Sequence, residues 1–391
     1  MRAGVPTAAR ISTRAFPMTQ NPLQRLHDAG QSIWLDFIER AMLHNGDLTR
    51  RIRDDALTGM TSNPTIFEKA LAEGDAYDAQ IRDAAGQLSA QQLFEVLATT
   101  DVRDACDAYA GIHRATNGGD GYVSIEVSPG AANDSAATID EARRLWKTVD
   151  RPNVMIKVPG TVEGAKAVRQ LISEGINVNI TLLFAIAAHD RVIDAYMAGL
   201  EDRLAAGRPI DTLASVASFF VSRVDTEVDH RLAALGPSAA ALAGKAAVAN
   251  AKLAYALFAE RFDTDRWRTL AAKGGRLQRP LWASTSTKNP AYRDVMYVED
   301  LIGPDTVNTM PPATIEAFRD HGQVARTVDA GLDRARREIA ALEAAGVSID
   351  QVTEKLLGDG LASFQKSYDS LIAGLAAKSG QLGRQLRAAV S

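Results

Sequence analysis

The chain has 391 residues, of which 46% are hydrophobic and 24% are charged, with 29 glycines and 14 prolines. These ordinary globular values exclude a disordered, collagen-like or low-complexity chain. The net charge of −4 argues against a nucleic-acid-binding protein, which needs a concentrated basic face. Cys106 is the only cysteine, so a disulfide framework and a metal site built from several cysteines are both excluded.

No apolar run approaches the ~18–20 residues that a membrane-spanning helix needs, so we expect a cytoplasmic protein without a membrane partner. Residues 1–17 carry Arg2, Arg10 and Arg14 and no acidic residue, a composition that superficially suits a transit peptide. A more ordinary start follows at Met18. We therefore expect residues 1–20 to be a flexible N-terminal extension and residues 21–391 to form one folded unit.

Beyond the extension, the chain repeats one pattern. A short, largely apolar run ends in polar residues and is followed by a segment with helical periodicity. Strands that alternate with helices in this way predict parallel βα units, and eight of them indicate a single closed (β/α)8 barrel. The runs are Ser32–Phe37, Leu57–Ser62, Gly121–Val127, Asn153–Val158, Ile176–Leu182, Leu213–Phe219, Pro280–Ser284 and Thr306–Met310.

Helix signals lie between and after these runs. Thr161, for example, is a candidate N-cap for a helix that Gly175 ends. The segment from Gly236 to Phe262 is rich in alanine and predicted to be helical. From about Pro311 to Ser391 the pattern is helical throughout, which exceeds what an eighth barrel helix needs. We therefore expect additional helices, mainly at the C-terminus.

Alternation along the runs predicts which side chains face the barrel interior. Alternate residues of a barrel strand point to the helix layer and to the interior. The apolar parity suits the helix layer, which leaves Asp36, Glu126 and Lys157 facing inward near the ends of their runs. Burying an unpaired charge costs several kcal/mol, and barrel active sites form at the carboxyl ends of the strands. The three charges are therefore either a structural ion network or a catalytic centre.

The residue types in this group suit Schiff-base chemistry. An amine must be unprotonated to attack a carbonyl, and burial between apolar neighbours favours the neutral amine of Lys157. Iminium formation and aldol cleavage also need proton transfers, and Glu126 and Asp36 could serve as proton carriers in different steps.

Further candidates lie at or beyond other strand ends. Arg223 and Lys288 could hold a phosphate, although their alternative interpretation is ordinary surface cations. None of the six histidines lies at a strand end beside the carboxylates, and phosphate-loop, zinc-protease and nucleophile-elbow motifs are absent from the sequence. We therefore expect no metal and no cofactor. The uncharged groups that suit the hydroxyls of a polyol are Asn63, Asn179, Thr181 and Ser218.

The motifs that contain these residues resemble those of transaldolases, specifically the longer bacterial form with extra C-terminal helices. The resemblance extends from about Pro22 to the end of the chain. Such a set of motifs in this order is highly specific. In chain order the motifs are Ile33–Asp36, Thr61–Thr65, Val123–Val127, Asn153–Pro159, Ile176–Phe184, Ser218–Arg223 and Trp282–Pro311.

The resemblance implies a (β/α)8 enzyme that works without a cofactor in the non-oxidative pentose phosphate pathway. It would transfer a dihydroxyacetone unit from fructose 6-phosphate or sedoheptulose 7-phosphate to erythrose 4-phosphate or glyceraldehyde 3-phosphate. On that pattern Lys157 forms the Schiff base, and Asp36 takes the proton from the C4 hydroxyl of the donor. Glu126 moves protons through a water molecule held by Thr181.

The resemblance further implies that Asn63, Asn179 and Ser218 bind hydroxyls of the three-carbon unit and that Arg223 binds the phosphate. Shorter transaldolases place an arginine after the seventh strand as a second phosphate ligand. The candidate here is Lys288, a point charge without the bidentate fork of arginine.

Two other functions stay open at this point. One is a Schiff-base aldolase, a lyase that releases free dihydroxyacetone. The other is a non-catalytic protein that binds sugar phosphates, in which the inward charges form only an ion network. The sequence is compatible with a monomer and with a homodimer.

Overall fold

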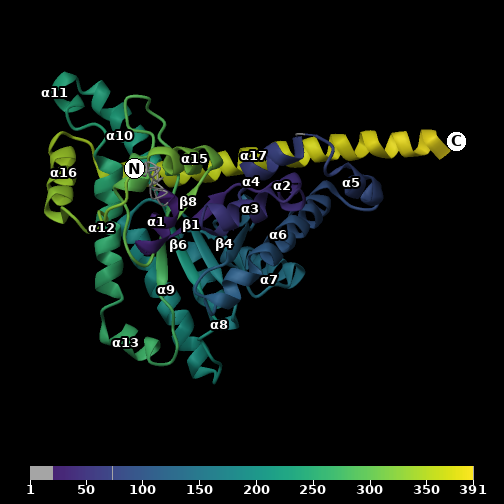
Figure 1. Ribbon diagram of the computed structural model, residues 1–391, viewed down its shortest axis with the longest axis horizontal. Coiled ribbons are helices and arrows are strands. Elements are labelled where there is room, and N and C mark those ends of the chain that lie inside the picture. The colour runs from purple at the N-terminus through teal and green to yellow at the C-terminus, as the bar shows by residue number, and fades with distance from the viewer. Residues whose placement is uncertain (1–20, 73, 391) are drawn as a thin grey trace, which may run out of the picture.

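Eight parallel strands close into a barrel at the centre of the molecule (Figure 1). The computed structural model describes residues 21–72 and 74–390, the last five through their backbone alone, so the extension expected over residues 1–20 lies outside the described residues. Each strand pairs with its sequence neighbours, and β8 pairs with β1, which confirms the predicted (β/α)8 barrel. The strands are β1 (Gln31–Asp36), β2 (Leu57–Thr61), β3 (Tyr122–Glu126), β4 (Val154–Pro159), β5 (Val178–Leu183), β6 (Ser215–Phe220), β7 (Gln278–Ala283) and β8 (Thr306–Met310).

The strands follow the apolar runs of the sequence. β8 has the predicted bounds, and the other strands differ from their runs only at their ends. The interior is packed with side chains rather than open. The indole of Trp34, for example, fits because Gly59 is its partner on β2, where a Cβ atom would lie 2.5 Å from the indole nitrogen.

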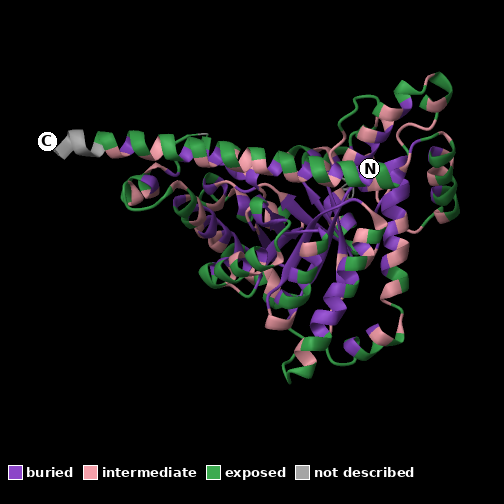
Figure 2. Ribbon diagram, turned by 180° about the vertical axis from the view of Figure 1, so that it is seen from behind, coloured by how far each residue is buried: buried purple, intermediate pink, exposed green. Residues whose placement is uncertain are grey.

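Helices cover the outer face of the barrel, and their buried stripes pack against the strands (Figure 2). One predicted helix, α8, is capped by Thr161 and ends at Gly175 in the left-handed conformation, as expected. The helices before β5 are α1 (Pro22–Asp28), α2 (Arg40–His44), α3 (Asp47–Asp54), α4 (Pro64–Ala72), α5 (Asp78–Ala84), α6 (Ala90–Ala115), η1 (Pro129–Ala131), α7 (Ser135–Val149) and α8 (Val162–Glu174).

Further helices follow β5 and extend the architecture beyond a minimal barrel. None of the helices among residues 21–72 and 74–390 is long and apolar enough to cross a bilayer. These later helices are α9 (Ile186–Ala205), α10 (Ser222–Ala234), α11 (Pro237–Ala240), α12 (Ala246–Arg261), α13 (Asp265–Ala271), α14 (Met296–Glu299), α15 (Pro312–His321), α16 (Leu332–Ala344) and α17 (Ile349–Val390).

The C-terminal region departs from the predicted helical pattern in two segments, a short turn over residues 345–348 between α16 and α17 and a longer segment before α16. Residues 322–331 between α15 and α16 are irregular. The backbone of this segment forms hydrogen bonds with a distant residue, because the amides of Thr327 and Val328 both donate to the carbonyl of Ile302. The prediction for this segment was wrong because a distant acceptor replaces the hydrogen bonds of a helix. The segment from Gly236 to Phe262 is likewise divided into α11 and α12 by a turn.

Helix α17, with 42 residues, crosses the carboxyl end of the barrel and runs on past it (Figure 1). Its approach to β5 is close at Gly360, where a Cβ atom would lie 2.9 Å from Leu182 Cδ2 and 3.6 Å from an Arg223 guanidinium nitrogen. Leu182 itself has a φ of 58°, so the strand leaves its regular path at this point. The helix therefore covers part of the barrel mouth.

One buried histidine of the helix layer predicts how stability depends on pH. His189 of α9 is buried, its ring lies 5.7 Å from that of Phe219, and neither ring nitrogen has a hydrogen-bond partner in the described part of the chain. Burial lowers its pKa from 6.5 to about 4. As the pH is lowered from 6.5 to 4, the unfolded chain therefore takes up a proton that the folded chain does not. The free energy of unfolding decreases over this range.

We expect the wild type to lose about 3 kcal/mol of unfolding free energy from this group between pH 7 and pH 4. His189→Leu removes the group and should flatten this part of the profile. Urea unfolding of both proteins across this range measures the difference, in which titration of the other groups cancels. Parallel profiles would contradict the prediction.

Candidate active site

Lys157 lies inside the barrel at the carboxyl end of β4. In the strand register it pairs with Glu126 of β3 and Asn179 of β5. Its Nζ lies 3.5 Å from Glu126 Oε2 and donates a hydrogen bond of 3.1 Å to the carbonyl of Ser62. The residue is 5% exposed, which confirms the predicted inward orientation. The nucleophile candidate is therefore shielded from bulk solvent and in contact with a carboxylate.

Asp36 ends β1 in the same layer of the barrel. Its Oδ1 accepts a hydrogen bond of 2.7 Å from Thr61, and the hydroxyl of Thr61 lies 2.6 Å from that of Thr309. Burial raises the pKa of both Asp36 and Glu126, while the positive charge of Lys157 acts in the opposite direction. Carboxyl groups whose pKa is raised toward neutrality can both donate and accept protons at physiological pH.

A chain of hydrogen bonds fixes the uncharged candidates. Ser218 Oγ donates to Asn179 Oδ1 at 2.7 Å, and Asn179 Nδ2 donates to Ser124 Oγ at 3.0 Å. Asn63 immediately precedes α4, and its Oδ1 accepts a hydrogen bond of 3.0 Å from the backbone N–H of Ile66. Its amide nitrogen therefore keeps both protons for another acceptor, such as a substrate hydroxyl.

Two cations without acidic partners lie at the mouth. The guanidinium of Arg223, in the first turn of α10, lies 5.2 Å from the ring of Phe220, and burial lowers its pKa. Lys288 follows β7 and donates to Ser286 Oγ at 2.6 Å; burial and the charge of Arg223 lower its pKa. Neither side chain pairs with a carboxylate within 4.0 Å in residues 21–72 and 74–390. Two converging cations without a counter-ion are suited to bind an anion.

A second group of charges inside the barrel shows what a structural network looks like here. Asp120 accepts hydrogen bonds from Ser32 Oγ and, at 2.8 Å, from Trp34 Nε1. Arg279 donates to Ser32 at 2.7 Å and lies 3.6 Å from Asp120. This network occupies the amino-terminal half of the barrel, and each of its carboxylate oxygens accepts a hydrogen bond, as expected for buried polar groups.

The group around Lys157 differs in this respect. Glu126 Oε2 and Thr181 Oγ1 are buried, yet neither forms a hydrogen bond within the described residues. Lys157, which contacts Glu126, borders a cavity of about 420 Å³ together with Asp36 and the two cations. Unused hydrogen-bonding capacity next to a cavity indicates a site for a small polar ligand rather than a structural ion network.

The structure adds residues that the sequence interpretation missed. Thr61, which orients Asp36, and Ser62, which accepts from Lys157, belong to a motif that was recognised only for Asn63. Lys69 of α4 and Phe364 of α17 also border the cavity. Phe364 had no local signal, because it reaches the mouth only through the packing of the C-terminal helix.

Metal-ligating side chains show no comparable cluster. Within the ranges that the structure describes, no group of three or more His, Cys, Asp or Glu residues could hold a metal ion.

Comparison with known proteins adds relatives of similar length. A family model described as Transaldolase/Fructose-6-phosphate aldolase matches residues 33–375. A protein named Transaldolase from Frankia alni is 48% identical over 366 residues, which are 93% of this chain and 99% of that protein. Transaldolase from Thermobifida fusca is 50% identical over 355 residues, 90% of this chain and 96% of that protein. Transaldolase 1 from Streptomyces coelicolor is 47% identical over 366 residues, 93% of this chain and 96% of that protein. The chain therefore belongs to the transaldolase/fructose-6-phosphate aldolase family.

Proposed function

We propose that this enzyme is a transaldolase. It transfers a dihydroxyacetone unit from a ketose phosphate to an aldose phosphate, the reaction of the non-oxidative pentose phosphate pathway. The relatives are named for this activity, and the match covers nearly their whole length. The observation that carries the proposal is the buried amine of Lys157, 3.5 Å from Glu126, in a cavity with unpaired cations at its mouth.

The first half of the reaction attaches the ketose to the enzyme. Nζ of Lys157 attacks the C2 carbonyl, and a proton passes from nitrogen to oxygen to give a carbinolamine. The carboxyl of Glu126 then protonates the carbinolamine hydroxyl, the C2–O bond breaks, and water leaves behind a cationic iminium. Glu126 Oε2 and Thr181 Oγ1 form no hydrogen bond within the described residues, so both are suited to bind that water molecule.

The second half divides the carbon chain. Asp36 takes the proton of the C4 hydroxyl, the C3–C4 bond breaks, and its electron pair moves to the iminium, which becomes a neutral enamine. The aldose phosphate leaves, and an acceptor aldehyde reverses these steps. Asn63, Asn179 and Ser218 hold the hydroxyls of the three-carbon unit in this proposal. Asn63 and Ser218 border the cavity, and Asn179 accepts a hydrogen bond from Ser218.

Arg223 and Lys288 are assigned to the phosphate, and their removal should affect substrate binding most. We expect Arg223→Ala to raise KM for fructose 6-phosphate by about 10–100-fold with a smaller change in kcat, because the contact exists in both ground and transition states. Steady-state kinetics with fructose 6-phosphate and with unphosphorylated fructose check this, since fructose should be turned over equally by both proteins.

The matched control is Arg143→Ala, which removes an exposed arginine of α7 that pairs with Glu174. Its KM should not change. An Arg223→Ala enzyme that loses as much activity toward fructose as toward the phosphate ester would contradict a role in phosphate binding.

The products of one reaction test the function and separate it from the lyase alternative. Incubation with fructose 6-phosphate and erythrose 4-phosphate should yield sedoheptulose 7-phosphate and glyceraldehyde 3-phosphate in equal amounts. Free dihydroxyacetone as the main product would identify a lyase. No conversion of either substrate by folded protein would overturn the proposal.

A further inference from the structure

Lys157 and Glu126 face different cavities. Lys157 borders the 420 Å³ cavity at the barrel mouth, together with Asp36 and Arg223. Glu126 borders a second and larger cavity of about 650 Å³. Asn63 borders both. The 3.5 Å contact between Nζ and Oε2 therefore lies between two cavities, one bordered by Lys157 and the other by Glu126.

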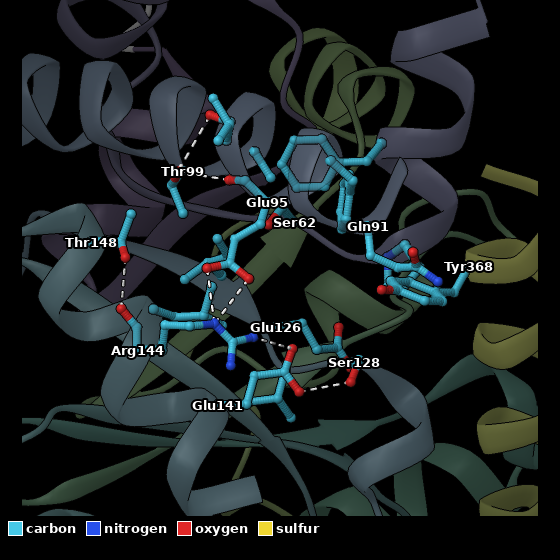
Figure 3. Close-up of a pocket in the computed structure, with 18 of the residues that line it drawn as sticks. Ser62, Gln91, Glu95, Thr99, Glu126, Ser128, Glu141, Arg144, Thr148 and Tyr368 are labelled. Atoms are coloured by element: carbon cyan, nitrogen blue, oxygen red, sulfur yellow. Dashed lines mark hydrogen bonds and ion pairs between the residues drawn. The ribbon is translucent and has the colours of Figure 1, made fainter. Parts of the chain in front are cut away.

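The second cavity passes through the helix layer between α6 and α7, with Tyr368 of α17 on one side (Figure 3). Its inner end is formed by Glu126 and the neighbouring residue Ser62. At its outer rim Leu88 and Val96 are 37% and 38% exposed, so the cavity opens to solvent.

The charges of its wall do not suit a sugar phosphate. Figure 3 shows Arg144 between two glutamates. Its Nε lies 3.0 Å from both carboxylate oxygens of Glu95, and a terminal nitrogen lies 3.7 Å from Glu141. Among the described residues that border the cavity, the one basic side chain is thus already paired, and Glu126 adds a further carboxyl. The rest of the wall is mixed: apolar side chains such as Phe94 and Leu145 lie beside uncharged polar ones such as Gln91.

The proposed chemistry needs water at Glu126 twice in each turnover. Formation of the iminium releases one water molecule, and its hydrolysis to free the product consumes one. Both events occur while a phosphorylated sugar fills the mouth below α17. A sugar anchored at Arg223 and Lys288 obstructs that exit, whereas the inner end of the second cavity borders the carboxyl that protonates the leaving hydroxyl.

We propose that the cavity between α6 and α7 is the route by which water enters and leaves the catalytic centre, separate from the mouth that admits sugar phosphates. This inference rests on the proposed function, since it assigns a path to the water of the Schiff-base steps. Glu126 supplies the link to the chemistry, because it borders this cavity while its Oε2 lies 3.5 Å from Lys157 Nζ and forms no hydrogen bond within the described residues.

The chain offers a clean way to close this route after folding. Its single cysteine, Cys106, is buried, and burial raises the pKa of the thiol, so thiol reagents should leave it unmodified. Val96→Cys places one reactive thiol at the rim, and benzyl methanethiosulfonate then fills the opening. Methyl methanethiosulfonate on the same thiol is the small-adduct control. Leu235→Cys, at a site that is 54% exposed at the end of α10, is the remote control.

The readout is loss of oxygen-18 from fructose 6-phosphate labelled at C2, measured above the enzyme-free rate, because the open-chain ketose also exchanges this oxygen slowly by reversible hydration. The enzyme-dependent part is lost only when the water released at the catalytic centre exchanges with solvent. We expect the benzyl adduct of Val96→Cys to slow label loss and kcat by at least about tenfold, with KM unchanged. The methyl adduct and both adducts of Leu235→Cys should behave as the unmodified enzymes do.

Two results would overturn the inference. One is complete benzyl modification, shown by mass, with unchanged label loss. The other is a raised KM with unchanged kcat, which would make the cavity part of the sugar site. Failure of the proposed function is distinguished by the unmodified wild type: absence of both label loss and a borohydride-trapped adduct would refute the Schiff-base chemistry itself.

Discussion

Lys157→Ala is expected to abolish transfer, with kcat lower by on the order of 10⁴-fold or more, because the covalent intermediate cannot form without the amine. Lys157→Arg should be equally inactive, since a guanidinium stays protonated and does not attack a carbonyl. Fructose 6-phosphate with borohydride should add a stable mass to Lys157 of the wild type, and neither variant should gain it. Mass spectrometry of the trapped protein checks this.

A second buried lysine supplies the control for folding. Nζ of Lys252 on α12 donates to the carbonyls of Thr327 and Ala330 at 2.8 and 3.0 Å and has no place in the proposed site. Lys252→Met should lower stability because it leaves these acceptors unpaired, yet turnover per folded molecule should be preserved. A Lys157→Ala enzyme with residual transfer close to that of Lys252→Met would refute the assigned nucleophile.

Asp36→Asn and Glu126→Gln are expected to lower kcat by about 10²–10⁴-fold each, the usual contribution of a positioned acid or base. The two variants should stop at different steps, because the carboxyls serve different proton transfers in the proposed mechanism. Asp36→Asn should still form the iminium and should accumulate an adduct of the intact six-carbon sugar when borohydride is added. Glu126→Gln should form any adduct slowly.

Rapid mixing with substrate, followed by borohydride and mass spectrometry, measures both the rate of adduct formation and the length of the attached carbon chain. Thr61→Val is a useful companion, since it removes only the 2.7 Å hydrogen bond to Asp36 and should act in the same direction with a smaller effect. Identical adduct rates and chain lengths in the two carboxyl variants would show that the assigned division of labour is wrong.

Short-range periodicity accounts for how much of the fold could be predicted. Alternation of apolar and polar residues identified all eight strands and also the inward face that holds Lys157, because both depend on neighbours within one strand. Strand ends were less accurate, since pairing with adjacent strands decides where a strand stops. The helix expected across residues 322–331 failed for a similar reason, as Thr327 and Val328 bond to Ile302.

The candidate site could be predicted only where its residues lie in recognisable motifs at strand ends. The pairing of Arg279 with Asp120 could not be predicted from the sequence around Arg279, because Asp120 lies on a loop far away in the chain. Phe364 was missed because α17 reaches the mouth only after the whole barrel has formed. Lys288, the candidate for the second phosphate ligand, borders the same cavity as Arg223.

By itself, the order of residues determined the barrel, the inward charges and the family, because each of these is written in local patterns or motifs. Only the tertiary structure decided that Glu126 and Lys157 open onto separate cavities and that a C-terminal helix covers part of the mouth. Such features arise from packing between segments far apart in the chain, and the shape of the space between them is not encoded by any single segment.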